Sequence, residues 1–313
     1  MKLPVTVIGG YLGAGKTTLI NHLLRNANGL RLAVLVNEFG ELSIDADLIE
    51  AEEDGLMSIS GGCVCCAYGN DMIGVLEDIR DAKPGFDHVL LEASGVALPA
   101  SIMTTVGLVR GLRPDATVVL ADAEQIRRNA ANKFLSDTIQ RQLEQADIIL
   151  VTKADLVTSE QLADVTEWLK DRAPNARIVS AEKGRVSLDA IIGALPLPVR
   201  GIPPSRSPHS DFASTVLRPD GPVDAEALAA SLAADPTVTR AKGYVAQKDG
   251  LALIHVVGNR HTVETAEGTH DIGVVCIGLK HEFAAERIEE LATLSASARN
   301  SSIRFSPMVS LLL

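Results

Sequence analysis

The chain has 313 residues, of which 46% are hydrophobic and 22% are charged. This composition supplies enough apolar material for a buried core and excludes an intrinsically disordered protein. The 40 acidic and 29 basic residues give a formal net charge of −11, and no basic cluster stands out, which argues against a nucleic-acid partner.

The first residues lead directly into a short apolar strand, and no apolar run of about 18 residues follows. We therefore expect no signal peptide, no membrane partner and a cytoplasmic protein. Four cysteines, three of them within four positions, suit a reducing compartment better than a disulfide framework.

Up to about residue 180, short β-branched runs alternate with amphipathic helical stretches. The predicted strands are Val5–Gly9, Leu32–Asn37, Leu56–Ser60, His88–Glu92, Thr117–Asp122, Ile148–Thr152 and Arg177–Val179. The helices predicted between them include Lys16–Asn26, Asp71–Ala82 and Ser159–Arg172. Several of these strands are almost entirely apolar, as strands covered on both faces should be. The pattern predicts an α/β fold with a doubly wound, mostly parallel sheet.

The stretch from residue 196 to 210 is rich in proline, and we interpret it as a linker. The elements predicted after it are Phe212–Leu217, Val223–Ala234, Ala241–Ala246, Leu251–Val257, Asp271–Ile277 and His281–Ser297, of which the second and the last are helices. We therefore predict a first domain over residues 1–195 and a second, smaller α+β domain over residues 211–313.

The strongest signal for function is a glycine-rich segment between the first strand and the first helix. Its sequence, Gly10-Tyr11-Leu12-Gly13-Ala14-Gly15-Lys16-Thr17, fits the pattern G-x-x-x-x-G-K-[ST] of a P-loop NTPase. Glycines let backbone N–H groups surround a polyphosphate, Lys16 is expected to reach the β- and γ-phosphates, and Thr17 is expected to bind Mg²⁺. The predicted nucleotide-binding residues here are Gly10, Gly13, Ala14, Gly15, Lys16, Thr17 and Thr18, although Thr18 is more typical of a helix face.

A second loop points to guanine. Thr152-Lys153-Ala154-Asp155 follows an apolar strand and resembles the N-K-x-D loop, in which the acid accepts both guanine N–H donors and the lysine stem covers the ring. Adenine lacks that pair of donors, so Asp155 favours GTP. Ser180 and Ala181, after the next strand, are expected to offer a backbone N–H to the guanine oxygen. Threonine in place of asparagine supplies only part of the amide's hydrogen bonding, and an ordinary loop with a lysine and an aspartate is the alternative.

Acidic residues end two further strands. Glu92 opens the segment Glu92-Ala93-Ser94-Gly95 and is expected to hold Mg²⁺ or to orient water, while Gly95 lets the backbone approach a γ-phosphate. Lys16 and Glu92 are thus the predicted catalytic residues. For Asp122, a structural and a functional role remain equally supported.

Three cysteines lie in the segment Gly61-Gly62-Cys63-Val64-Cys65-Cys66. Three thiolates on one short loop suit Zn²⁺, Co²⁺ or Cu⁺ and not Mg²⁺. The fourth ligand position can be filled by water, by Glu38 or by a client protein. The alternatives are small buried hydrophobic residues or a redox pair.

The second domain also contains cysteine and histidine side chains that can bind a metal. Cys276 lies in an apolar run and is expected in the core. His255 interrupts a similar strand. His261 and His270 allow an accessory metal site, but a satisfied or exposed histidine is the more common outcome.

Four segments together carry a resemblance to a known family: Gly9-Gly10-Tyr11-Leu12-Gly13-Ala14-Gly15-Lys16-Thr17-Thr18, Asn37-Glu38-Phe39-Gly40, Gly61-Gly62-Cys63-Val64-Cys65-Cys66 and Glu92-Ala93-Ser94-Gly95. In this order they resemble the CobW-like P-loop GTPases, and the predicted α+β domain resembles that family's C-terminal domain. The resemblance implies that Cys63, Cys65 and Cys66 bind a transition metal and that Glu92 serves magnesium and hydrolysis. The chain departs from many relatives in Thr152 and in lacking a histidine-rich run, so metal storage by such a run is not expected.

The resemblance implies a GTPase that hydrolyses GTP to GDP and delivers zinc, or else cobalt, to a client metalloprotein or metal-cofactor enzyme. We expect the nucleotide and cysteine loops to share the carboxyl edge of the sheet, so that hydrolysis controls how firmly the metal is held. The alternatives are a metal-responsive GTPase switch without delivery, and a P-loop ATPase or kinase with a structural zinc.

Overall fold

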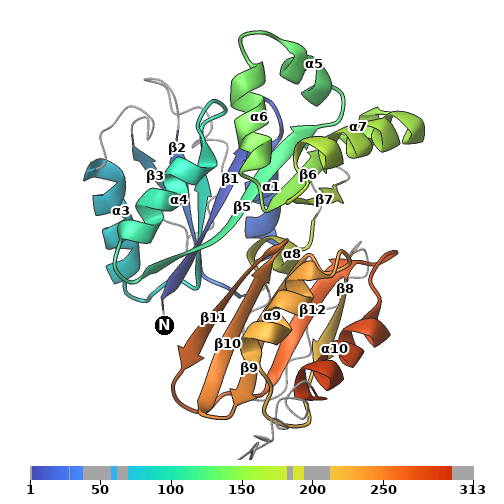
Figure 1. Cartoon of the computed structure of the whole chain (residues 1–313). Helices are drawn as coiled ribbons and strands as arrows, with labels where there is room; N and C mark the ends of the chain where they lie inside the picture. Colours follow the sequence, from blue (N-terminus) through green and yellow to red (C-terminus); the bar gives the residue numbers. More distant parts are fainter. Residues whose placement is uncertain are drawn as a thin grey trace, which may run out of the picture.

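The computed structural model describes residues 2–27, 29–37, 58–61, 70–181, 186–193 and 212–297. This part of the chain forms two sheets, each with its own helices (Figure 1). The predicted linker, residues 196–210, lies outside the described residues, and the domain boundaries stay a prediction. None of the described helices is long and apolar enough to cross a membrane.

The first sheet has seven parallel strands among the described residues. They are β1 (Leu3–Gly10), β2 (Leu32–Asn37), β3 (Ser58–Gly61), β4 (His88–Glu92), β5 (Leu112–Asp122), β6 (Ile148–Thr152) and β7 (Arg177–Ser180). Their order is β3-β2-β4-β1-β5-β6-β7, so β1 lies between β4 and β5. Because all seven run in the same direction, the loops after them meet at one edge of the sheet, where open α/β folds bind their ligands.

Helices cover both faces of this sheet, which confirms the predicted doubly wound α/β fold. One face packs against α1 (Lys16–Arg25) and α8 (Leu188–Ile192). The helices on the other face are α3 (Asn70–Asp81), α4 (Pro99–Leu108), α5 (Ile126–Ala131), α6 (Ser136–Glu144) and α7 (Ser159–Arg172).

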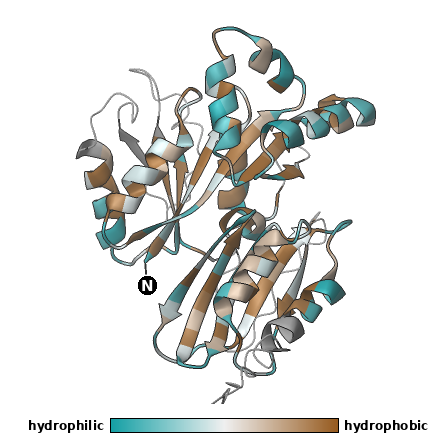
Figure 2. Cartoon of the chain, viewed as in Figure 1, coloured by the Kyte–Doolittle hydropathy of each residue, from teal (hydrophilic) through white to brown (hydrophobic). Residues whose placement is uncertain are grey.

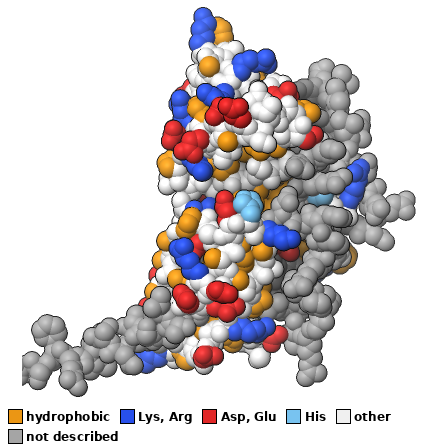
Figure 3. All heavy atoms as spheres, turned by 90° about the vertical axis from the view of Figure 1, so that its right-hand side faces the viewer, with side chains coloured by type: hydrophobic (Ala, Val, Ile, Leu, Met, Phe, Trp, Pro, Cys, Tyr) orange, Lys and Arg blue, Asp and Glu red, His pale blue; other side chains and the backbone are white. Residues whose placement is uncertain are grey.

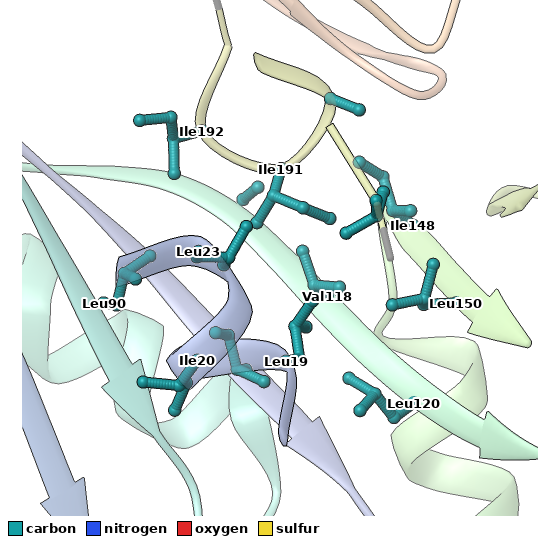
Figure 4. Close-up of a cluster of buried hydrophobic side chains, with 14 of the residues drawn as sticks. Leu19, Ile20, Leu23, Leu90, Val118, Leu120, Ile148, Leu150, Ile191 and Ile192 are labelled. Carbon is teal, nitrogen blue, oxygen red and sulfur yellow. The ribbon is translucent and has the colours of Figure 1, made fainter. Parts of the chain in front are cut away.

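The amino end of α1 is held in place by its apolar face. Leu19, Ile20 and Leu23 are 0% exposed and pack on residues of β4, β5 and α8 (Figure 4). Full burial of one such side chain stabilises a fold by about 1.5–3 kcal/mol. The loop that precedes α1 is therefore fixed on a rigid base.

The second sheet is antiparallel, with the order β11-β10-β9-β12-β8. Its elements are β8 (Phe212–Leu217), α9 (Ala225–Ala234), β9 (Arg240–Gln247), β10 (Gly250–Val257), β11 (Arg260–Ala266), β12 (Gly273–Leu279) and α10 (Ala285–Ser297). Both helices pack on one face of the sheet, and the apolar residues run along its central strands (Figure 2). This confirms the predicted second α+β domain.

Ionic contacts join the two domains at the amino ends of β5 and β6, opposite the edge that carries the loops. Arg240 of β9 binds Asp115 of β5 through Nη1 and Oδ2 at 2.8 Å, with both side chains buried. Arg260 of β11 pairs with Asp147, which directly precedes β6. On the outer surface, by contrast, acidic and basic side chains are intermingled over the face drawn in Figure 3.

Candidate functional site

The predicted phosphate loop joins β1 to α1. Gly10, Gly13 and Gly15 have φ values of 127°, 74° and 95°, a region that residues with a Cβ rarely adopt. A Cβ on Gly10 would lie 2.6 Å from the carbonyl oxygen of Leu120 on β5, so only glycine fits there. The N-cap of α1 is Gly15, whose lack of a side chain keeps the helix start open to an anion.

The side chains of Lys16 and Thr17 both lie beside the phosphate loop. Lys16 is 8% exposed, and its Nζ donates to the carbonyl oxygen of Gly10 at 3.1 Å. Thr17 Oγ1 lies 3.5 Å from Oε1 of Glu92, which ends the adjacent strand β4 and is 3% exposed. Thr18 is exposed on α1. The structure thus brings together a hydroxyl and a carboxylate oxygen, which are hard donors of the kind Mg²⁺ prefers.

The loop after β4 packs directly on the phosphate loop. A Cβ on the buried Gly95 would lie 2.8 Å from the backbone nitrogen of Leu12, so glycine permits this close approach. The carbonyl oxygens of Gly95 and Ala97 both accept from Nε2 of Gln142 on α6, at 3.2 and 2.8 Å. The sequence gives no indication of Gln142, because nothing in the pattern of α6 separates a buried glutamine from an exposed one.

Thr152 connects the phosphate loop to the predicted guanine loop. It is buried at the end of β6, and its Oγ1 donates to the carbonyl oxygen of Ala14 at 2.8 Å. In the sequence, Thr152 stands where the N-K-x-D loop has asparagine, and it offers only part of the hydrogen bonding of that residue. In the structure its hydroxyl joins two loops that are 138 residues apart.

Lys153 and Asp155 share one turn. Lys153 has φ 57° and ψ 30°. Among the described residues other than glycine, it alone has a positive φ. Its Nζ donates to Oδ2 of Asp122 at 2.6 Å. Asp155 lies on the 3₁₀ helix η1 (Ala154–Leu156), and it is exposed.

Ser180, the last residue of β7, and Ala181, which follows it, differ in exposure. Ser180 is exposed at the end of the strand. The N–H of Ala181 donates to the carbonyl oxygen of Val151 at 2.8 Å, which extends the pairing of β7 with β6. The N–H of Ala181 is therefore already engaged, and of these two residues Ser180 stays the predicted backbone contact to guanine. Residues 182–185 lie outside the described residues.

The predicted transition-metal ligands Glu38, Cys63, Cys65 and Cys66 lie outside the described residues. The strands that lead to them are described. Asn37, the last residue of β2, pairs with Gly61, the last residue of β3. Both strands end at the edge that carries the phosphate loop.

The remaining candidate ligands lie in the second domain. His255 is 5% exposed, His261 Nε2 is 2.9 Å from Oε1 of Glu226, and His270 stacks on Tyr244 with ring centroids 3.9 Å apart. Cys276 is fully buried, as expected. Within the described ranges, no three such side chains gather as a metal site.

Comparison with known proteins identifies both domains. Residues 4–180 match the CobW/HypB/UreG nucleotide-binding domain, and residues 212–293 match the cobalamin synthesis protein cobW C-terminal domain. The chain is 33% identical over 224 residues to the zinc chaperone CobW of Pseudomonas aeruginosa, covering 61% of this chain and 60% of that protein. It is 30% identical over 239 residues to the zinc chaperone YjiA of Escherichia coli, covering 71% and 73%.

A solved structure of Zn(II)-bound YjiA GTPase from Escherichia coli covers 94% of this chain and 99% of its own, with 24% identity and a TM-score of 0.46. The chain spans only 60% of the length of the Pseudomonas relative, so that protein's full activity is not transferred here. The family match nevertheless covers more than half of the chain and coincides with the α/β domain that carries the loops described above. The chain belongs to the CobW/HypB/UreG family.

Proposed function

We propose that the chain is a GTP-hydrolysing metal chaperone. It binds zinc, or cobalt as the second choice, through Cys63, Cys65 and Cys66, and it delivers the ion to a client protein under the control of GTP. The names of its relatives as zinc chaperones support the class of cargo. The observation that carries the nucleotide part is the approach of Thr17 Oγ1 to Glu92 Oε1 at 3.5 Å beside the phosphate loop.

The residues of the loop fit magnesium and a nucleotide triphosphate. Thr17 and Glu92 would hold Mg²⁺, which neutralises charge on the β- and γ-phosphates when bound. Lys16 would exchange the carbonyl oxygen of Gly10 for phosphate oxygens, which a buried ammonium favours more strongly than a neutral acceptor. Asp155 would accept from guanine, and this supports GTP over ATP as substrate.

Strand register supports a metal site at the same edge. Val36 of β2 pairs with Glu92 of β4, and the next residue, Asn37, pairs with Gly61 of β3. Because β2 lies between β3 and β4, Gly61 at the end of β3 is two strand spacings of about 4.8 Å from the strand that ends in Glu92. Gly61 precedes Cys63 by two residues, a reach of at most about 7 Å. We accordingly expect the thiolates to respond to the γ-phosphate.

The test is metal affinity in two nucleotide states. Purified protein is titrated anaerobically with Zn²⁺ and with Co²⁺ against competing chelators, with Mg²⁺ and either a non-hydrolysable GTP analogue or GDP. We expect affinities that differ by about 5- to 150-fold, the range of typical coupling between two sites. Cys65→Ser should weaken binding, whereas Cys276→Ala, which removes a buried thiol of the second domain, should not.

Two results would overturn the proposal. Equal affinities in both nucleotide states would remove the control by GTP, and unchanged affinity in Cys65→Ser would remove the site. Delivery is tested separately by adding a metal-accepting chelator to the loaded protein. A chaperone transfers the ion faster during GTP hydrolysis, whereas a switch retains it.

A further inference from the structure

Asp122 is held rigidly at the end of β5, next to the guanine loop. Its Cα pairs with that of Thr152 in the β5–β6 register, and its side chain is 9% exposed. Oδ1 accepts from the backbone N–H of Glu124 at 2.9 Å, which fixes the rotation of the carboxylate. The second oxygen, Oδ2, is thereby directed to Lys153.

Lys153 is restrained at both ends. Its backbone has the left-handed conformation with φ 57°, which is unfavourable for a residue with a Cβ and fixes the direction in which the side chain leaves. Its Nζ binds Asp122 at 2.6 Å, a charge-assisted hydrogen bond. The Lys153 side chain, whose methylene stem joins these two fixed points, is one-third exposed and belongs to the same turn as Asp155.

This arrangement bears on how a base is bound. A lysine stem that is free in solution loses considerable rotamer freedom when a ligand immobilises it, and that loss weakens binding. A stem already fixed by Asp122 loses much less. The chain therefore holds a preformed apolar wall beside the carboxylate that would recognise guanine.

We infer that Asp122 is a positioning residue for the nucleotide base: through Lys153 it presets the surface on which the guanine ring of GTP and GDP lies. The inference rests on the proposed function, in which this loop binds guanine. Asp122 does not touch the phosphate loop in any contact described above, so its effect should be equal for GTP and GDP and absent from the hydrolytic step.

The first experiment measures the affinity of the full-length protein for fluorescent GDP and GTP analogues in Asp122→Asn. We expect about 5- to 20-fold weaker binding of both nucleotides, with an unchanged single-turnover rate of GTP hydrolysis at saturation, which is the signature of lost uniform binding. Asp137→Asn is the matched control, because Asp137 forms an exposed ion pair with Arg141 on α6. It should bind as wild type does.

The second experiment separates positioning through Lys153 from a structural role of Asp122. Lys153→Met keeps most of the stem, removes the ammonium and leaves the bond from Glu124 intact. If Asp122 acts through Lys153, then Lys153→Met weakens GDP binding by about the same factor, and adding Asp122→Asn to it changes nothing further. Additive effects of the two substitutions would overturn the inference. This variant also provides the test if Asp122→Asn does not fold.

Inosine diphosphate, which lacks the 2-amino group of guanine, distinguishes the failure of this inference from the failure of the proposed function. Asp122→Asn should weaken GDP and inosine diphosphate equally, because the stem covers the ring and not its edge. Asp155→Asn should abolish the preference for GDP over inosine diphosphate. Wild-type protein without any preference for guanine over adenine would refute the proposed function. A clear guanine preference combined with wild-type binding by Asp122→Asn would refute only the role of Asp122.

Discussion

At the scale of single residues, Thr152 shows how one hydroxyl can hold two loops together. Its Oγ1 donates to the carbonyl oxygen of Ala14 inside the phosphate loop, and both residues are buried. Removing one partner of a buried hydrogen bond leaves the other unsatisfied, which is more unfavourable than the bond itself is favourable. Thr152 therefore matters to the shape of the phosphate loop as well as to the guanine loop.

Thr152→Val, which keeps the side-chain shape and removes the hydroxyl, tests this. We expect the free energy of unfolding to fall by about 1–3 kcal/mol. GDP affinity should fall about tenfold, which corresponds to about 1.4 kcal/mol of binding. Denaturant unfolding and nucleotide titration measure the two effects. The control is Thr166→Val on α7, which loses only a hydrogen bond to the Leu162 carbonyl one turn away. Equal GDP affinity in the two variants would contradict the role of Thr152.

The sequence predicts which residues carry the motifs but not what they contact. Lys16 and Asp155 were expected at their loops because short-range patterns place glycines, a lysine and an acid between strand and helix. The partners of Thr152 and Lys153 are Ala14 and Asp122, 138 and 31 residues away. Such pairs depend on which strand ends become neighbours, and a single sequence does not state the strand order.

At the scale of elements, apolar periodicity predicted the buried strands well. β2, β4 and β6 have the predicted bounds because each is a continuous apolar run between polar loops. The predicted strand Thr117–Asp122 begins too late, since β5 starts at Leu112. The first residues of β5 include charged ones, because Asp115 pairs with Arg113 of the same strand and with Arg240 of the second domain.

β11 (Arg260–Ala266) was not predicted at all. It is an edge strand beside β10, and its mostly polar sequence, RHTVETA, carries little apolar alternation. Strand signals depend on burial of at least one face, so an edge strand with one large apolar residue, Val263, escapes them. For the same reason, central strands are predicted well from the sequence and edge strands are predicted poorly.

A second consequence at this scale concerns α6, which holds the loop after β4 through Gln142. Gln142→Leu would leave the carbonyl oxygens of Gly95 and Ala97 without this donor in a buried environment. We expect the rate constant of GTP hydrolysis to fall severalfold while GDP affinity stays unchanged, because the loop serves the γ-phosphate in the proposed function. Single-turnover hydrolysis and GDP titration are the measurements.

Gln140→Leu is the matched control for that substitution. Gln140 lies on the same helix, but its Nε2 donates to Glu144 on the exposed side. Hydrolysis at the wild-type rate is expected there. If Gln142→Leu also hydrolyses GTP as wild type does, the loop does not depend on α6 for its catalytic position.

At the scale of the whole molecule, the second domain contacts the amino ends of the strands whose carboxyl ends lead into the loops predicted to bind guanine. Arg177, at the start of β7, donates to the carbonyl oxygens of Ala233, Asp235 and Val238 around the end of α9. Together with the ion pairs of Asp115 and Asp147, these contacts join β5, β6 and β7 to the second domain. The sequence gives no sign of them, since each joins residues more than 50 positions apart.

This interface also encloses two histidines. His88 is 1% exposed and its Nε2 lies 2.9 Å from Thr6 Oγ1, while His255 Nε2 has no hydrogen-bond partner among the described atoms. Burial lowers the pKa of His88 to about 3, although Asp115 acts in the opposite direction. Burial lowers the pKa of His255 to about 2, with Arg113 and Lys242 acting in the same direction.

Stability should therefore fall as the pH falls below about 6.5, the ordinary pKa of histidine. Between there and about pH 3 the unfolded chain binds protons at these two residues that the folded chain does not, and each contributes up to about 1.4 kcal/mol per pH unit. Denaturant unfolding at about pH 7.5 and 5.5 measures the loss. His255→Gln cannot titrate and should reduce it markedly, whereas His281→Gln, an exposed histidine, should leave it unchanged. Identical losses in these two variants would mean that the interface opens to protons while the chain is still folded.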